Sequence, residues 1–280
     1  MEKLISKDFC YGNACILNGC MQMYQATGDR KYLEFVTKYL ENVIDEDGNI
    51  NDSSSEFNID SINTFRVLFY IHDVTGEEKY IRTIGFVYGR LRELQQNTYK
   101  DHRIYPFYME YETRCNKKAN YNDIVAGLSE GIKKADGMAQ RMEYLCTVID
   151  VIDAMSIEIF EHYKSLEKLF KEEIKKLLPE LTRQEKKSAK GGEKGDFGQS
   201  REEVIPFFTA AYAILKACRI GVLSKEKYEE TGLGILDAVM PEGMFCFEDV
   251  EWSGGETDGA AESVGILMMA YAQKLMMQKQ

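Results

Sequence analysis

Proline and tryptophan are scarce in this chain of 280 residues, which contains four prolines and one tryptophan. Because proline interrupts helices and frequents turns, this scarcity favours long helices over a loop-rich β fold. Long apolar runs are also missing: the longest nearly apolar stretch, 204–215, falls well short of the roughly 20 residues that a membrane helix needs. The first residues contain no apolar segment of signal-peptide length. We therefore expect a cytoplasmic protein with no membrane partner.

Basic residues are outnumbered, with 35 Lys and Arg against 46 Asp and Glu and a formal net charge of −11. Such a composition is poor at neutralising phosphates, so it predicts no nucleic-acid partner. Histidine is limited to three residues, and none is spaced with another histidine or a cysteine as metal ligands are. The seven cysteines include no Cys-x-x-Cys pair and are expected to be free thiols. We predict no metal site and no cofactor.

An internal repeat is the clearest feature of the chain. Thr-Gly-Asp-Arg-Lys-Tyr at 27–32 returns as Thr-Gly-Glu-Glu-Lys-Tyr at 75–80, and each copy lies between two stretches with apolar residues three and four apart. Such spacing is typical of amphipathic helices, and glycine commonly ends a helix. The two copies begin 48 residues apart, at 27 and 75. A repeat of this length predicts helical hairpins stacked on copies of themselves. Two closures are open at this point, an open solenoid and a closed (α/α) toroid.

The apolar periodicity predicts an all-α protein of about eleven helices in a single domain, 1–280. A long irregular loop is predicted at 179–199, because Pro179 and several glycines interrupt the pattern there. The neighbouring lysine-rich stretch, 164–194, is typical of a solvated helix face. The predicted helices are 11–26, 30–43, 60–74, 77–96, 105–115, 120–133, 137–155, 159–178, 203–217, 224–239 and 258–278.

Several segments resemble one family. YQATGDRKYL at 24–33, IDEDGNI at 44–50 and FNIDSIN at 57–63 are similar to the first third of unsaturated rhamnogalacturonyl hydrolases, glycoside hydrolase families 88 and 105. HRIYP at 102–106 and NYNDIV at 120–125 are similar to later segments of the same family. The resemblance implies a shortened and divergent six-hairpin (α/α) barrel, complete or incomplete, with a sugar-binding cup at one end.

The resemblance also implies a reaction. In this family a carboxylic acid protonates the C4=C5 double bond of an unsaturated uronyl sugar, water adds at C5, and the hemiketal collapses to release the next sugar. Asp60 matches the family's first active-site aspartate and Asn63, one helical turn later, would bind substrate beside it. The alternative for Asp60 is that it only caps the helix that begins there.

Four further residues are candidates for binding the sugar. His102 matches the family histidine before Tyr-Pro, although a histidine in a surface loop would give the same pattern. Tyr105 and Tyr108 follow it closely, and Trp252 is the only tryptophan. Aromatic faces commonly stack on sugar rings, although aromatic residues at helical spacing are more often part of a core.

The catalytic acid has two alternative assignments. A gap-free continuation of the family motif through YPFYMEYET at 105–113 puts Glu112 on the family's acid. The second alternative is a deletion of about three helical turns that removes the acid, which fits the short separation of Glu112 from Asn120. Under the deletion, Glu112 is an exposed helix charge.

Two functions follow from these assignments. The first is a glycoside hydrolase of unsaturated uronyl oligosaccharides with an eroded active site, in which Glu112 and Asp60 are catalytic. The second is a non-catalytic relative that binds a carbohydrate or a protein partner through the same cup. In either case an anionic sugar needs nearby cations, for which Arg66, Arg103 and Arg201 are candidates.

Overall fold

The computed structural model describes residues 9–51, 57–96, 101–190, 201–239 and 257–279. Over these residues the regular elements are helices, and extended pairing is limited to an isolated bridge between Ile44 and Ile50. The helices are α1 (Tyr11–Thr27), α2 (Arg30–Val43), α3 (Ile59–Thr64), the 3-10 turn η1 (Phe65–Val67), α4 (Leu68–Thr75), α5 (Glu78–Gln96), η2 (His102–Ile104), α6 (Tyr105–Arg114), α7 (Tyr121–Lys134), α8 (Gly137–Ala154), α9 (Phe160–Lys190), α10 (Arg201–Arg219), α11 (Lys225–Val239) and α12 (Thr257–Gln278).

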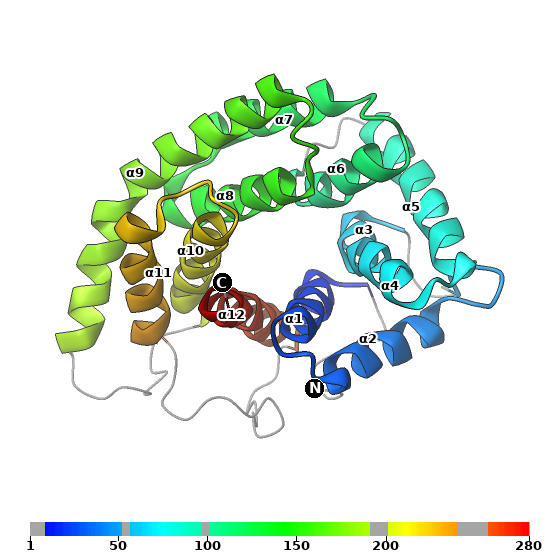
Figure 1. Ribbon diagram of the computed structural model, residues 1–280, viewed down its shortest axis with the longest axis horizontal. Coiled ribbons are helices and arrows are strands. Elements are labelled where there is room, and N and C mark those ends of the chain that lie inside the picture. Colours follow the sequence, from blue (N-terminus) through cyan, green and yellow to red (C-terminus); the bar gives the residue numbers. More distant parts are fainter. Residues whose placement is uncertain (1–8, 52–56, 97–100, 191–200, 240–256, 280) are drawn as a thin grey trace.

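The helices form two concentric rings (Figure 1). The inner ring consists of α1, α3 with α4, α6, α8, α10 and α12, and the outer ring of α2, α5, α7, α9 and α11. The first and last inner helices pack against each other, so the ring closes. The fold is the predicted (α/α) toroid rather than an open solenoid, and within the described residues α12 has no outer partner.

The repeated sequence forms the same turn twice. Gly28 and Gly76 adopt left-handed backbone conformations, with φ of 75° and 69°, and end α1 and α4. Each donates its backbone N–H to a carbonyl four residues earlier at 2.8 Å. Only glycine takes this conformation without steric cost. The repeat therefore marks the two turns that connect an inner helix to an outer one.

Ring closure depends on two glycines. A Cβ on Gly265 of α12 would lie 2.2 Å from the backbone carbonyl carbon of Cys15 in α1, and one on Gly19 would lie 2.8 Å from the carbonyl oxygen of Gly265. These distances are shorter than any van der Waals contact. The absence of a side chain at both positions therefore allows the two helices to approach closely enough to close the ring.

Two predicted boundaries differ from the structure. The predicted helix 60–74 is divided by η1, whose 3-10 geometry separates α3 from α4. The loop predicted at 179–199 is wrong for 179–190, because α9 continues through Pro179 to Lys190. Leu177 and Leu181, on either side of the proline, are both buried, so the apolar stripe of α9 continues across it. The rest of that prediction, 191–199, lies outside the described residues.

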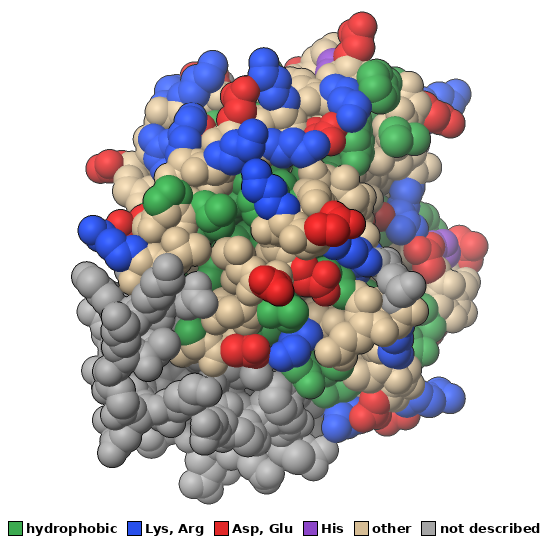
Figure 2. Space-filling view, turned by 60° about the vertical axis from the view of Figure 1, so that its left-hand side comes forward, with side chains coloured by type: hydrophobic (Ala, Val, Ile, Leu, Met, Phe, Trp, Pro, Cys, Tyr) green, Lys and Arg blue, Asp and Glu red, His purple; other side chains and the backbone are tan. Residues whose placement is uncertain are grey.

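Charged side chains cover the outer surface around α9 (Figure 2). Its lysines pair with glutamates three or four residues away: Lys164 and Lys171 bind Glu167, and Lys176 binds Glu173. Such pairs on a helix surface contribute only about 0.3–0.5 kcal/mol each. The described part of the basic stretch is therefore a solvated helix face. Among the described helices, none is long and apolar enough to cross a membrane.

Candidate active site

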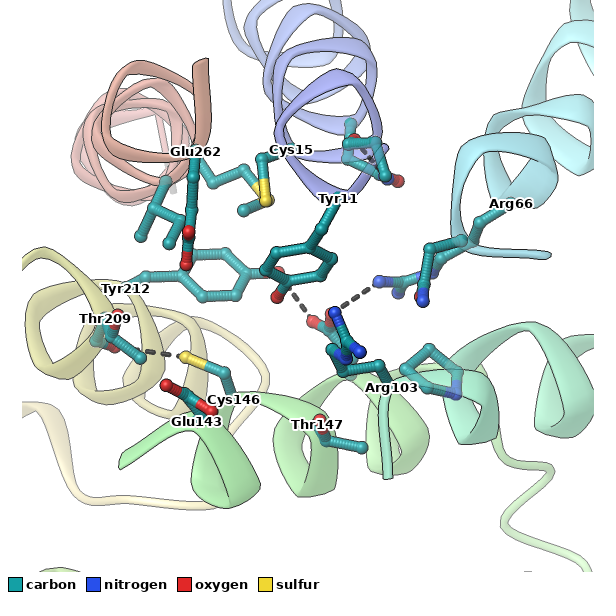
Figure 3. A pocket seen from close by; sticks show the side chains of 17 residues that line it. Tyr11, Cys15, Arg66, Arg103, Glu143, Cys146, Thr147, Thr209, Tyr212 and Glu262 are labelled. Atoms are coloured by element: carbon teal, nitrogen blue, oxygen red, sulfur yellow. Dashed lines mark hydrogen bonds and ion pairs between the residues drawn. The ribbon is translucent and has the colours of Figure 1, made fainter. Parts of the chain in front are cut away.

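A pocket opens on the axis of the toroid, lined from the amino-terminal and middle parts of the inner helices (Figure 3). We call it the first pocket. Side chains from α1, α3, η1, η2, α6, α8, α10 and α12 converge on it. Its lining residues are Tyr11, Ala14, Cys15, Asn18, Asn63, Arg66, Arg103, Pro106, Glu143, Cys146, Thr147, Asp150, Thr209, Tyr212, Glu262, Ile266 and Met269.

One face of α8 supplies four of these residues. Glu143, Cys146, Thr147 and Asp150 follow one another at intervals of three, one and three, which puts them on a single helical face. The opposite face of α8 is apolar and buried against the core. A polar stripe on an otherwise apolar helix was the signal in the sequence that could have identified these residues.

Asp150 is the centre of a buried charge network. Its carboxylate accepts hydrogen bonds from Arg66, from Lys216 at 2.8 Å and from the hydroxyl of Tyr212 at 2.5 Å. Burial alone would raise the pKa of Asp150, but Arg66 and Lys216 outweigh it and hold that pKa well below its usual range. Asp150 is therefore a fixed anion, and it cannot donate a proton near neutral pH.

The surroundings of Glu143 shift its pKa in the opposite direction from that of Asp150. Burial raises the pKa of its carboxyl above the ordinary value, Arg103 partly opposes the shift, and Asp101 adds to it. The carboxyl lies 3.8 Å from Nε2 of His102. Burial lowers the pKa of His102 to about 4, so the histidine is neutral near pH 7 and gives Glu143 no charge partner. Burial therefore shifts the pKa of Glu143 upward, in the opposite direction to that of Asp150.

The ring of His102 is held from two sides. Its Nδ1 lies 2.9 Å from the hydroxyl of Thr147, and its ring packs on Tyr144 with centroids 4.0 Å apart. It is buried, so the alternative of a histidine in a surface loop is wrong. His102 is not part of the pocket lining itself, but both Thr147 and Glu143 are.

Arg103 is fixed by two carboxylates and an aromatic ring. Its guanidinium donates to both oxygens of Asp101 and, at 3.1 Å, to Asp60, and it lies 4.8 Å from the centre of the Tyr11 ring. The helix cap predicted as the alternative role of Asp60 is made by Asn58, which forms a capping box with Ser61. Asp60 instead orients Arg103 at the edge of the pocket.

The structure brings some of the predicted binding residues to the pocket. Asn63 lines it, as do Arg66 and Arg103. Tyr105 and Tyr108 are core residues outside the lining: the hydroxyl of Tyr105 lies against Gly127, and that of Tyr108 accepts a hydrogen bond from Arg92. The prediction that these two tyrosines bind the sugar is not supported. Trp252 and the side chain of Arg201 lie outside the described residues.

Glu112 is not part of the pocket. It is fully buried, and its oxygens accept hydrogen bonds from the Tyr88 hydroxyl at 2.8 Å, from the Asn116 side chain, and from the backbone and side chain of Asn120 at 2.9 Å each. Pro106 of the same helix lines the pocket, and a residue six positions later lies about 240° around the helix. Glu112 therefore faces α5 and α7, where it tethers the start of α7. The alternative that Glu112 is an exposed helix charge is wrong. The prediction that it is the catalytic acid finds no support in the lining of the first pocket.

Comparisons with known proteins agree with the resemblance drawn from the sequence. Residues 2–109 match Glycosyl Hydrolase Family 88. A family 105 glycoside hydrolase of C. acetobutylicum ATCC 824 has the same fold, with a TM-score of 0.72 and 19% identity over 97% of this chain and 96% of that chain. A protein described as a polysaccharide lyase is also similar, with a TM-score of 0.58 and 12% identity over 97% and 91%. The resemblance to families 88 and 105 is confirmed, the sequence match being limited to the first part of the chain.

Proposed function

We propose that this chain, a divergent relative of glycoside hydrolase families 88 and 105, hydrates the C4=C5 double bond of unsaturated uronyl oligosaccharides in the first pocket, with Glu143 as the acid. One observation carries the proposal. Glu143 lines the same pocket as Arg66 and Arg103, and burial raises its pKa. The pocket therefore combines a carboxyl whose pKa is raised with cations for an anionic sugar.

The chemistry needs one proton donor and one water. The Glu143 carboxyl gives its proton to C4 of the enol ether, and water adds at C5 while its proton returns to the Glu143 carboxylate. The hemiketal formed at C5 then opens to a ketone and leaves a hemiacetal at C1. This hemiacetal breaks down to an aldehyde and releases the next sugar. Asp150, held ionised by Arg66 and Lys216, is unsuited to the proton donation and instead holds Arg66 in place.

Arg66 and Arg103 would bind the uronate carboxylate. Among the described residues Arg66 donates one hydrogen bond, to Asp150, so most of its five N–H groups remain available. Arg103 is held in place by Asp60 and Asp101. A substrate carboxylate close to Glu143 would raise its pKa further, which favours the protonated form needed for the first step.

The second candidate is binding without catalysis. It is supported by Glu112, which stands at the family's acid position in the gap-free alignment but lies outside the pocket. It is also supported by Arg103, whose guanidinium lies 4.8 Å from the centre of the Tyr11 ring and so occupies one face of an aromatic residue of the pocket. Under this candidate the protein binds the sugar and releases it unchanged.

Loss of enol-ether ultraviolet absorbance from an unsaturated uronyl disaccharide distinguishes the two candidates. Turnover by the parent chain and none by Glu143→Gln supports the hydrolase. Calorimetric binding of the same disaccharide without any loss of absorbance supports the non-catalytic alternative.

A further inference from the structure

A second pocket lies on the same axis beyond the Arg66–Asp150 pair. Its lining comes from the carboxy-terminal parts of the inner helices, including Gln22 of α1, Arg114 of α6, Arg219 of α10 and Gln273 of α12. Its volume of about 250 Å³ has room for several waters or a small ligand. Nothing in the proposed hydration uses it.

The charge of this pocket differs from that of the first. Its four cations, Arg66, Arg114, Lys216 and Arg219, outnumber its three carboxylates, Glu110, Asp150 and Asp153. In the first pocket the balance is reversed, with two guanidiniums and three carboxyls. The second pocket is therefore electrostatically more favourable for an anion than the first pocket.

Its guanidinium groups have unused donors. Arg219 donates from Nε to Gln273 at 2.6 Å and from Nη2 to Asp153 at 3.5 Å, which leaves three of its five N–H groups without a partner among the described residues. Arg114 donates from Nε to Glu110 and from Nη1 to Asp73. Its Nη2 has no hydrogen-bond partner among the described residues. Both side chains are already oriented by these partners, which reduces the entropy lost when a ligand binds.

We propose that the second pocket binds the oxyanion group, phosphoryl or carboxylate, of a small ligand through Arg219 and Arg114. Fork-shaped guanidinium donors match the oxygens of both groups, and charge-assisted hydrogen bonds of this kind are the stronger ones. The neighbouring side-chain amides of Gln22 and Gln273 bind each other at 2.7 Å, so they form a fixed polar wall beside the oxyanion. The two pockets share Asn18, Arg66 and Asp150. The proposal does not rest on the hydration reaction, because Arg114 and Arg219 line the second pocket and not the first.

The test is calorimetric titration of the full chain with inorganic phosphate and, separately, with glucuronate. Arg219→Gln and Arg114→Gln should each weaken Kd about tenfold, because each removes one oriented fork. Lys168→Gln on α9 and Lys274→Gln on α12, two cations outside both pockets, are the controls and should change Kd by less than about twofold.

Binding of phosphate alone identifies a phosphoryl ligand, and binding of both anions identifies the oxyanion as the recognised group. The proposal is overturned if the folded parent binds neither anion, or if the two second-pocket variants and the two controls weaken binding equally. Arg114 is partly exposed, so Arg114→Gln keeps the test valid if Arg219→Gln fails to fold.

Discussion

The carboxyl of Glu143 lies 3.8 Å from Nε2 of His102, on two elements that are far apart in the sequence and meet beside the first pocket. The histidine has a pKa of about 4 because it is buried, so the contact is not an ion pair near neutral pH. His102 therefore adds no opposing charge to the burial that raises the pKa of Glu143. In the proposed function this carboxyl is the proton donor of the pocket.

The rate of hydration should fall as the pH rises through the pKa of Glu143. Because burial raises that pKa and Arg103 opposes the shift, Arg103→Gln should move the alkaline limb of kcat/KM to higher pH, even though weaker binding lowers its maximum. The measurement is a pH profile of kcat/KM for the parent and this variant. A limb that stays in place or moves to lower pH would show that Glu143 is not the titrating acid.

His102 should make the folded state less stable in acid. Its folded pKa of about 4 is below the ordinary value of 6.5, so the unfolded chain binds more protons between these values. The stability that it contributes is present above about pH 6.5 and is lost as the pH falls toward 4, by up to about 3 kcal/mol.

Denaturant unfolding across this pH range, on the parent and on His102→Gln, measures the effect. The variant should have a shallower decline than the parent. In NMR spectra of the parent, the histidine signal that disappears in His102→Gln should titrate near pH 4. Titration of that signal near pH 6.5 would contradict the account.

Ring closure should be sensitive to one methyl group. Gly265→Ala puts a Cβ against the backbone of α1 and should cost about 1–3 kcal/mol of unfolding free energy, or more, since backbone atoms cannot rotate away. Gly89→Ala is the matched control: its Cβ meets nothing within 4 Å, so the change should stabilise α5 by about 0.5–1 kcal/mol. Similar effects at both positions would contradict the close approach of α1 and α12.

Glu112 should contribute to stability and not to turnover. Glu112→Gln replaces an acceptor by an amide that faces the donors of Asn116 and Asn120, which should cost about 1–3 kcal/mol. The exposed Glu172→Gln on α9 is the control and should change stability by less than about 0.5 kcal/mol. An unchanged unfolding midpoint for Glu112→Gln would contradict the structural role.

The helices and turns could be read from the sequence because their causes are local. Apolar spacing gave the boundaries of most helices to within one or two residues, and Gly28 and Gly76 ended α1 and α4 as expected. The 3-10 turn at Phe65–Val67 and the continuation of α9 through Pro179 depend on packing with other helices, which local patterns do not contain.

The site was harder to predict because it depends on how each inner helix is rotated about its own axis. Arg66 and Arg103 were identified from charge alone, and both line the first pocket. Glu112 was selected by alignment, but the rotation of α6 turns it toward α7. Glu143 was missed, because the sequence does not show that the polar stripe of α8 faces the axis of the toroid.

The most direct test of the central claim is the rate of absorbance loss from an unsaturated uronyl disaccharide for three proteins: the parent, Glu143→Gln and Glu112→Gln. The account predicts turnover by the parent, a loss of about 100-fold or more in Glu143→Gln, and a rate close to that of the parent for folded Glu112→Gln. A rate close to that of the parent for Glu143→Gln, together with loss of turnover in folded Glu112→Gln, would contradict it.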